Sequence, residues 1–233
     1  MSPVAELYES VKERIARAAQ KAGRNPPGIE LIAVSKTWPA ATIEELIECG
    51  HDLFGENRVQ ELVAKVPMLP SRLRWHFIGH LQQNKVRKIL PLAETIHSVD
   101  SSDLARRIDL IAAELGLFPK VYLQVNTAGE AGKFGFQVEQ IREEFDSLLE
   151  LERIEIIGLM LIPPLASDPS LTRREFVALR ELRDELTARS GLPLTGLSMG
   201  MSRDYEIAIE EGSTAVRVGS SIFGSRKTRK AKE

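Results

Sequence analysis

The sequence predicts an α/β protein built as a single (β/α)8 TIM barrel. Short apolar runs recur along the 233 residues, and amphipathic segments separate them. This alternation is typical of βα units around a parallel sheet. Eight such units follow one another, and a (β/α)8 barrel usually takes about 250 residues. An open doubly wound sheet is the alternative. No linker rich in Pro, Ser or Gly divides the chain, so we expect one domain over 1–226 and a basic tail over 227–233.

A helix is expected before the first βα unit. Pro3 lies near its start, and Tyr8, Val11 and Ile15 recur at helical spacing with charged residues between them. This pattern is that of an amphipathic helix and not of a signal peptide.

The eight apolar runs are predicted to be strands. The run "LIAV" at 31–34 is apolar throughout, as expected of a strand covered on both faces. In chain order the predicted strands are 30–36, 51–56, 74–79, 95–100, 120–126, 155–161, 195–199 and 214–219. Amphipathic segments predict helices at 41–49, 57–66, 82–90, 102–115, 138–151, 171–189 and 203–211, with a short helix at 220–223.

The composition indicates a small-molecule ligand. Lys and Arg total 31 against 33 Asp and Glu, a formal charge of −2, which favours neither nucleic-acid nor membrane binding. The longest apolar stretch, at 156–166, contains Pro163 and Pro164 and is too short to span a bilayer. Cys49 is the single cysteine, and no closely spaced ligand set suggests a metal. We therefore expect no disulfide, no metal and a cytoplasmic protein.

Distinctive residues, most of them polar, follow the predicted strands. In (β/α)8 barrels the working groups lie at the carboxyl ends of the strands. Lys36 ends the first strand, Asn57 follows the second and His80 follows the third. Ordinary solvated loops would produce part of this pattern, and Lys36 could simply extend into solvent. The other strand-end residues are Glu56, Arg58, Ser98, Asp100, Asn126, Met160, Ser198 and Arg217.

Three histidines fall within predicted strands. His51, His76 and His97 are expected to be buried, hydrogen-bonded residues rather than ligands. No dinucleotide fingerprint follows the first strand, and the glycines before Lys133 do not have P-loop spacing.

The last two motifs indicate a phosphate site. "SMGMSRD" at 198–204 places Gly200 and Ser202 before a helix, and "VGSSIFG" at 218–224 places Gly219 and Ser220 where a short helix begins. Glycine allows close backbone approach, and exposed N–H groups attract an anion. These barrels commonly bind phosphate at the loops after strands seven and eight. Turn and capping roles would explain each motif alone, but their shared position favours phosphate.

A lysine facing a phosphate site predicts Schiff-base chemistry. Desolvation and nearby cations lower the pKa of a lysine until its neutral amine can attack an aldehyde. Two ligands fit Lys36: a sugar phosphate, as in a class I aldolase, and pyridoxal 5′-phosphate (PLP). Arg217 favours PLP, because strand alternation directs Arg217 and Gly219 to the same side. The guanidinium would face a pyridine nitrogen while Gly219 and Ser220 hold the phosphate.

Eight motifs, in order over about residues 30–226, resemble those of the pyridoxal phosphate homeostasis protein family. They are "AVSKTWP", "FGENRVQE", "WHFIGHLQQNK", "IHSVDS", "VNTAGEAGKFGF", "GLMLIPP", "LSMGMSRDYEIAI" and "GSTAVRVGSSIFGSR". This family is similar to the N-terminal barrel of alanine racemase and of ornithine-type decarboxylases. The resemblance implies a fold-type III PLP-binding barrel.

The same resemblance implies PLP as the cofactor and a role for each matching residue. Lys36 would form the Schiff base, and Arg217 would face the pyridine nitrogen. The hydroxyls and backbone around the phosphate would come from Ser198, Ser202, Gly219 and Ser220. Ser220 stands where threonine is also common in the family, and the hydroxyl is kept. The remaining cofactor-binding residues implied are Asn57, His80 and Met199.

We expect a monomeric carrier of PLP and not a catalyst. Arginine opposite the pyridine nitrogen disfavours ring protonation, which makes the ring a weaker electron sink. The related racemases append a β-rich second domain, whereas this chain ends soon after "IFGSR". The implied partners are PLP and apo-enzymes that require it, with Lys133 as a candidate helper in transfer. A PLP-dependent amino-acid racemase or decarboxylase is the alternative.

Overall fold

The computed structural model describes residues 2–130, 132–164 and 168–224. These residues contain all the predicted strands and helices. The predicted basic tail at 227–233 and the end of the predicted domain at 225–226 lie outside the described residues.

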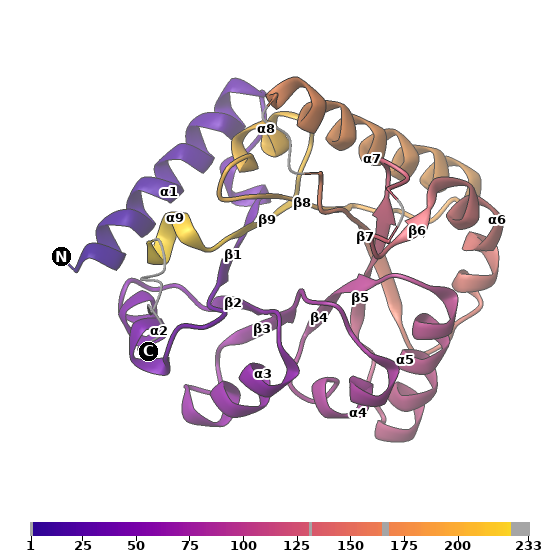
Figure 1. The fold of residues 1–233 in the computed structure, drawn as a ribbon, viewed down its shortest axis with the longest axis horizontal. Coiled ribbons are helices and arrows are strands. Elements are labelled where there is room, and N and C mark those ends of the chain that lie inside the picture. Colours follow the sequence, from indigo (N-terminus) through magenta and orange to yellow (C-terminus); the bar gives the residue numbers. More distant parts are fainter. Residues whose placement is uncertain (1, 131, 165–167, 225–233) are drawn as a thin grey trace, which may run out of the picture.

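Eight parallel strands form a closed ring (Figure 1). Their order around the ring is β1, β2, β3, β4, β5, β7, β8 and β9, and β9 pairs with β1 to close it. The predicted (β/α)8 barrel is therefore confirmed. The strands are β1 (Glu30–Val34), β2 (Leu53–Glu56), β3 (Arg74–Phe77), β4 (Thr95–Val99), β5 (Lys120–Asn126), β7 (Glu155–Met160), β8 (Gly196–Met201) and β9 (Ala215–Val218).

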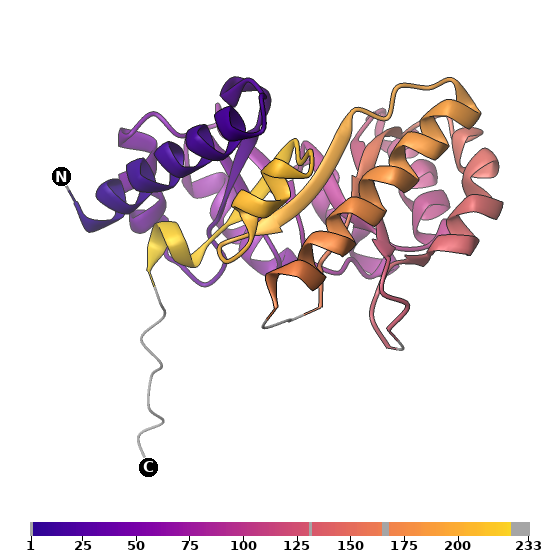
Figure 2. The same ribbon diagram turned by 90° about the horizontal axis from the view of Figure 1, so that it is seen from above.

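The α-helices surround the ring on its outer side (Figure 1). They are α1 (Pro3–Lys21), α2 (Ala40–Glu48), α3 (Val59–Lys65), α4 (Val86–Ile89), α5 (Ser102–Leu115), α6 (Val138–Leu149), α7 (Pro169–Ser190), α8 (Tyr205–Glu210) and α9 (Ser220–Phe223). Short 3-10 turns are η1 (Pro26–Gly28), η2 (Val66–Met68) and η3 (Gln83–Lys85). In Figure 2 the loop between β5 and β6 (Phe136–Gln137) projects on the side where α9 lies, which is the carboxyl end of the strands. This end is called the mouth below.

The N-terminal helix α1 begins where the sequence predicts it. The Ser2 hydroxyl accepts a hydrogen bond from the Ala5 N–H at 3.2 Å, which satisfies one of the free donors of the first turn. The helix packs against α8 and α9, the two helices that flank the last strand. A pair of hydrogen bonds from Arg14 to the Glu206 carboxylate, at 3.2 and 2.7 Å, joins α1 to α8. Thus α1 covers the part of the barrel where the last strand meets the first.

Several predicted element boundaries differ from the structure, and two of the differences at amino-terminal sides have a clear physical cause. The strand predicted at 51–56 begins at Leu53, so His51 lies before it. The His51 Nε2 lies 2.7 Å from the Leu53 carbonyl oxygen, and its Nδ1 lies 3.2 Å from the Tyr8 hydroxyl. These side-chain bonds replace strand pairing. The helix predicted at 82–90 is a 3-10 turn over Gln83–Lys85 followed by one α-helical turn, and Pro91 stands two residues beyond its end.

Two further differences concern β1 and β6. The strand predicted at 30–36 ends at Val34, so Lys36 lies in the loop beyond it. The two-residue strand β6 was not predicted, since it pairs with β5 only at Val125 and Asn126. A strand of this length has no periodicity that a sequence could reveal.

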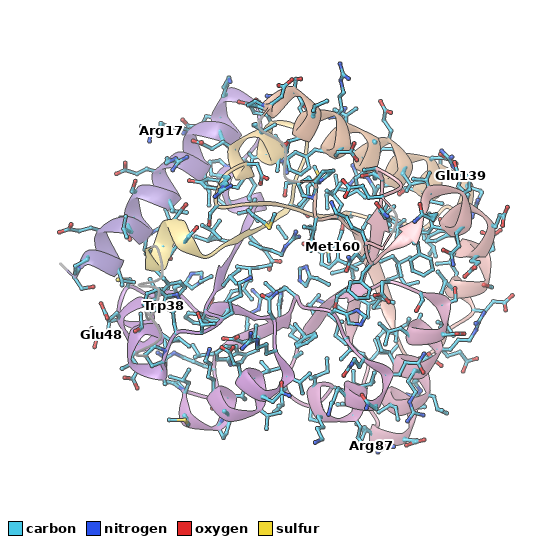
Figure 3. The ribbon with its side chains drawn as sticks, in the orientation of Figure 1. Arg17, Trp38, Glu48, Arg87, Glu139 and Met160 are labelled. Carbon is cyan, nitrogen blue, oxygen red and sulfur yellow. The ribbon has the colours of Figure 1, made fainter. Side chains whose placement is uncertain are left out.

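The core has an outer apolar layer and an interior that is partly polar. The largest cluster of buried apolar side chains joins residues of the strands to residues of the helices. A small second cluster consists of Ile32, Leu53 and Ala215. Figure 3 shows Met160 near the centre of the ring, whereas Glu139 lies on the outside. Buried polar side chains also face the interior and form the site described next.

Candidate functional site

Lys36 lies in the loop that follows β1 at the mouth of the barrel. Its neighbour Ser35 is fully buried, and Lys36 itself is half-buried. The lysine therefore stands at the boundary between the barrel interior and solvent, where a long side chain can keep its amine accessible.

The loop after β9 packs directly against the strand that leads to Lys36. A methyl group added at Gly219 would come within 3.3 Å of the Val34 carbonyl oxygen, so the two backbones are close. Farther along both loops, the Trp38 and Phe223 rings stack with their centroids 5.8 Å apart. The lysine loop and the glycine-serine loop thus lie side by side, as strand pairing of β1 with β9 requires.

A serine of the loop after β8 joins this pair. The Ser202 hydroxyl oxygen accepts hydrogen bonds from the N–H groups of Gly219 at 3.1 Å and Ser221 at 3.4 Å. The Ser221 hydroxyl donates back to the Ser202 carbonyl oxygen at 3.2 Å. Ser202, Gly219 and the adjacent Ser220 therefore gather hydroxyl and N–H groups in one place.

Gly200 allows the loop after β8 to turn toward this position. Its φ is +96°, in the left-handed region that glycine adopts freely. A Cβ at this position would also lie 2.6 Å from the Ala208 Cβ and 2.9 Å from the Tyr205 Cα. Both conformation and space therefore require glycine.

Arg217 reaches into the barrel from β9 and is held by neutral oxygen atoms. Its guanidinium donates to the Ser198 carbonyl oxygen at 2.8 Å, to the Ser198 hydroxyl, and to the Leu161 carbonyl oxygen at 2.9 Å. The residue is 4% exposed, and burial lowers its pKa to about 10, so it remains a cation at neutral pH. These bonds leave part of its N–H donors for another group.

A chain of hydrogen bonds continues from Arg217 across the interior. The Ser198 hydroxyl lies 2.8 Å from the His97 Nδ1, and the His97 Nε2 lies 3.0 Å from the His76 Nδ1. Burial lowers the pKa of His76 to about 4 and that of His97 well below its usual range, so both rings are neutral. The His76 Nε2 is buried without a hydrogen-bond partner among the described residues.

The structure places Ser198, expected at the phosphate, and Met199, expected at the cofactor, on opposite faces of β8. Ser198 is fully buried and bonds to Arg217 and His97, and no hydrogen bond joins it to Ser202 in the described chain. Met199 lies on the opposite face of β8, in the apolar layer between strands and helices. The alternation of side chains along a strand explains both placements. The Met199 side chain thus faces away from the barrel interior, and the expectation that Met199 contacts a cofactor stays a prediction.

Asn57 and His80 lie at the rim next to the lysine loop. Both line a small pocket of about 190 Å³ together with Arg58, Val59, Gln60, Gln82 and Lys85. His80 is fixed by a 3.1 Å contact of its Nδ1 with Asp100 and by stacking on Phe134, with ring centroids 3.7 Å apart. The Asn57 Oδ1 is buried without a hydrogen-bond partner in the described parts of the chain.

Lys133 follows β5 in the loop that projects from the mouth. Its Nζ lies 2.7 Å from the Glu130 carboxylate, within the same loop. The Asn126 side chain donates to the Glu130 carbonyl oxygen at 2.9 Å and so fixes the base of this loop.

Sequence reasoning missed a buried ionic cluster beside Lys36. Lys65, at the end of α3, contacts Glu56 and Glu61, and these groups bond to Ser35 and Thr37. Glu56 was recognised as a strand-end residue, but Glu61 and Lys65 were not singled out, because a spacing of four residues is typical of exposed pairs on a helix.

Within residues 2–130, 132–164 and 168–224, no group of three or more His, Cys, Asp or Glu side chains could hold a metal ion. No helix in these ranges is long and apolar enough to cross a membrane.

Comparison with known proteins assigns the family. The family model described as "Alanine racemase, N-terminal domain" matches residues 8–227. A pyridoxal phosphate homeostasis protein of Aquifex aeolicus is 44% identical over 223 residues, which cover 95% of this chain and 98% of that protein. The chain belongs to the pyridoxal phosphate homeostasis protein family. The resemblance inferred from the eight motifs is thereby confirmed.

Other members of the pyridoxal phosphate homeostasis protein family are similar over the same extent. The protein of Escherichia coli K12 is 39% identical over 236 residues, which cover 97% of this chain and 98% of that protein. PipY of Synechococcus elongatus, in a structure with PLP bound, has a TM-score of 0.81 at 44% identity and covers 90% of this chain and 100% of that one.

An alanine racemase of Clostridium difficile shares the fold, with a TM-score of 0.73 at 18% identity. The match covers 96% of this chain and 57% of that one.

Proposed function

We propose that this chain binds PLP as a Schiff base on Lys36, carries it reversibly and takes part in intracellular PLP homeostasis. The observation that carries the proposal is the packing of Gly219 against Val34, which puts the lysine loop beside the donors around Ser202. The stacking of Trp38 on Phe223 reinforces it. The PLP bound in PipY and the name shared by the relatives support the same ligand.

The residues at the mouth fit the chemical groups of PLP. The Lys36 amine would form a C=N bond to the aldehyde carbon, and the aldehyde oxygen would leave as water. The Ser202 hydroxyl and the hydroxyl and N–H groups of Ser220 would donate to the phosphate, and Gly219 would allow its close approach to the main chain. Asn57 and His80, which line the pocket at the rim, would contact the ring of PLP. The buried Asn57 Oδ1 is available for this contact, since it has no hydrogen-bond partner in the described residues.

Arg217 supports a carrier more than a catalyst. Bound PLP supplies an electrophilic aldehyde and a ring that can accept electrons. If its remaining N–H groups faced the pyridine nitrogen of bound PLP, the guanidinium would keep that nitrogen unprotonated, since a fixed cation would occupy its side. Ser198 and Leu161 hold the guanidinium in place. We propose a monomer that acts in the cytoplasm and delivers PLP to apo-enzymes when a competing amine displaces Lys36.

Addition of PLP to the purified chain tests the proposal. We expect a yellow complex whose colour disappears on borohydride reduction, with the reduced pyridoxyl group on the peptide that contains Lys36. Lys36→Met should abolish the colour, whereas Lys133→Met, a lysine of the same mouth that pairs with Glu130, should keep it. A wild-type chain that stays colourless with excess PLP, or carries the label elsewhere, contradicts the proposal.

The same sample separates the carrier from the alternative enzyme. A racemase or decarboxylase would exchange the α-proton of small amino acids in deuterated water or release carbon dioxide from them. We expect neither at a rate above that of free PLP.

A further inference from the structure

A buried ionic cluster lies directly beneath the lysine loop. It consists of Ser35, Glu56, Glu61 and Lys65 and is called the Lys65 cluster below. The Lys65 Nζ donates to the Ser35 carbonyl oxygen at 2.9 Å, to the Glu56 Oε1 at 2.6 Å and to the Glu61 Oε2 at 2.8 Å. Glu56 is fully buried and Lys65 is 8% exposed.

Stability alone is a weak reason for this arrangement. Removing two charges from water costs several kcal/mol per ion, and a buried pair often contributes no more than apolar residues of the same size. Burial raises the pKa of Glu56, and the hydrogen bonds from Lys65 and Ser35 oppose that shift. The feature of the cluster that calls for a functional explanation is therefore its hydrogen bonding to main-chain atoms of Ser35 and Thr37.

These bonds hold the main chain on both sides of Lys36. Before it, the Ser35 hydroxyl donates to the Glu56 Oε1 at 2.7 Å, and the Ser35 carbonyl oxygen accepts from Lys65. After it, the Thr37 N–H donates to the Glu61 Oε2 at 2.6 Å. Two bonds at Ser35 and one at Thr37 anchor the residues on either side of Lys36 and leave its Cα little freedom.

The conformation of Thr37 shows that this segment is constrained. Its φ is +68°, and it is the one non-glycine residue with positive φ in the described ranges. A β-branched residue in the left-handed region is strained and persists only where surrounding bonds impose it. The Glu61 carboxylate supplies such a bond at the Thr37 N–H.

We propose that Lys65, Glu56 and Glu61 are positioning residues that orient Lys36 for its reaction with the aldehyde of PLP. The inference rests on the proposed function. The cluster acts through the main chain: Lys65 ties Ser35 and the two carboxylates together, and Glu61 turns Thr37. The main chain at Lys36 thus has one conformation, which directs the side chain toward the loop of Gly219. PLP can then react without waiting for the loop to adopt that conformation.

Two substitutions at Glu61 test the proposal. Glu61→Leu removes the acceptor of the Thr37 N–H and one of the three acceptors of Lys65, whereas Glu61→Gln keeps an oxygen acceptor for the Thr37 N–H. We expect Glu61→Leu to slow formation of the coloured PLP complex by roughly tenfold to 100-fold, and Glu61→Gln to restore most of the rate. The matched control is Glu185→Leu, which breaks the ion pair with Arg142 on the outer helices and should load at the wild-type rate.

A second measurement works without PLP. In the ligand-free protein, the Thr37 amide proton should appear downfield because it donates to a carboxylate, and Glu61→Leu should remove this shift while amides of β1 stay in place. Thr37→Gly relieves the strain of the left-handed conformation, so the variant should unfold at the same or a higher temperature. Its more flexible main chain should nevertheless load PLP more slowly. A purely structural cluster would not separate loading from stability in this way.

The outcomes distinguish the two proposals. A wild-type chain that forms no complex overturns the proposed function and this inference with it. A wild-type chain that loads normally, together with a Glu61→Leu chain that loads at the same rate, overturns the inference alone, even if Glu61→Leu lowers the melting temperature.

Discussion

The Ser198 hydroxyl lies 2.8 Å from the His97 Nδ1, and this contact joins β8 to β4, two strands that are not neighbours in the barrel. The same Ser198 hydroxyl accepts a hydrogen bond from Arg217, and the His97 Nε2 is hydrogen-bonded to His76. The buried guanidinium is therefore part of a polar chain that runs through the interior. Any bound group at the mouth that faces Arg217 is coupled to two neutral histidines below it.

The donor and acceptor roles along this series of hydrogen bonds predict the histidine tautomers. Arg217 can only donate, and the Ser198 hydroxyl proton has no acceptor other than His97 among the described residues. His97 then carries its proton on Nε2 and donates to the His76 Nδ1, so both rings are Nε2–H tautomers. Long-range proton–nitrogen NMR spectra measure this directly. A proton on the His97 Nδ1 would reverse the chain and contradict the assignment.

The neutral histidines predict a loss of stability in acid. Burial lowers the pKa of His76 to about 4, so the folded protein binds fewer protons than the unfolded chain. The free energy of unfolding should therefore fall as the pH drops from about 6.5 to about 4, by up to about 3 kcal/mol from His76. Urea unfolding at a series of pH values measures this slope. His76→Gln should show a shallower slope, and an equal slope in both proteins would contradict the assignment.

Ser202 and Met199 should differ in their effect on PLP binding. Ser202→Ala removes the hydroxyl that connects the loops after β8 and β9, and we expect PLP affinity to fall about threefold to tenfold. Met199→Leu conserves volume in the apolar layer and should leave affinity unchanged. Titration by absorbance compares the two variants. An affinity loss in Met199→Leu comparable with that of Ser202→Ala would place the methionine side chain at the cofactor after all.

Gly200, the glycine of β8 with positive φ, should not tolerate alanine. Gly200→Ala adds strain at a φ of +96° and a contact at 2.6 Å with Ala208. We expect it to lower the free energy of unfolding by more than about 1 kcal/mol. Gly23→Ala is the matched control, because its φ is +66° but nothing lies within 4 Å of the added carbon. Equal losses in both variants would show that conformation alone matters.

Periodicity and motif order were enough to predict the barrel, since each βα unit repeats a pattern in the sequence. The sequence did not predict which side chains contact one another inside the barrel. Ser198 and Ser202 stand in one motif, yet β8 ends between them, so Ser198 faces inward to Arg217 whereas Ser202 lies in the turn that bonds to the Gly219 loop. Lys65 gave no signal, because its partners Ser35 and Glu56 come from two other elements. Side-chain direction at strand ends and contacts between distant segments depend on tertiary packing, which a single sequence does not encode locally.

The position of α1 has a consequence for synthesis. Its partners, α8 and α9, and the strand β9 that pairs with β1 are all made last. The apolar residues of α1 that these partners cover therefore stay exposed on the nascent chain until α8, β9 and α9 have been made. Barrel closure is a late, long-range event, and a nascent chain arrested before residue 215 should remain open and bind chaperones that recognise apolar surface.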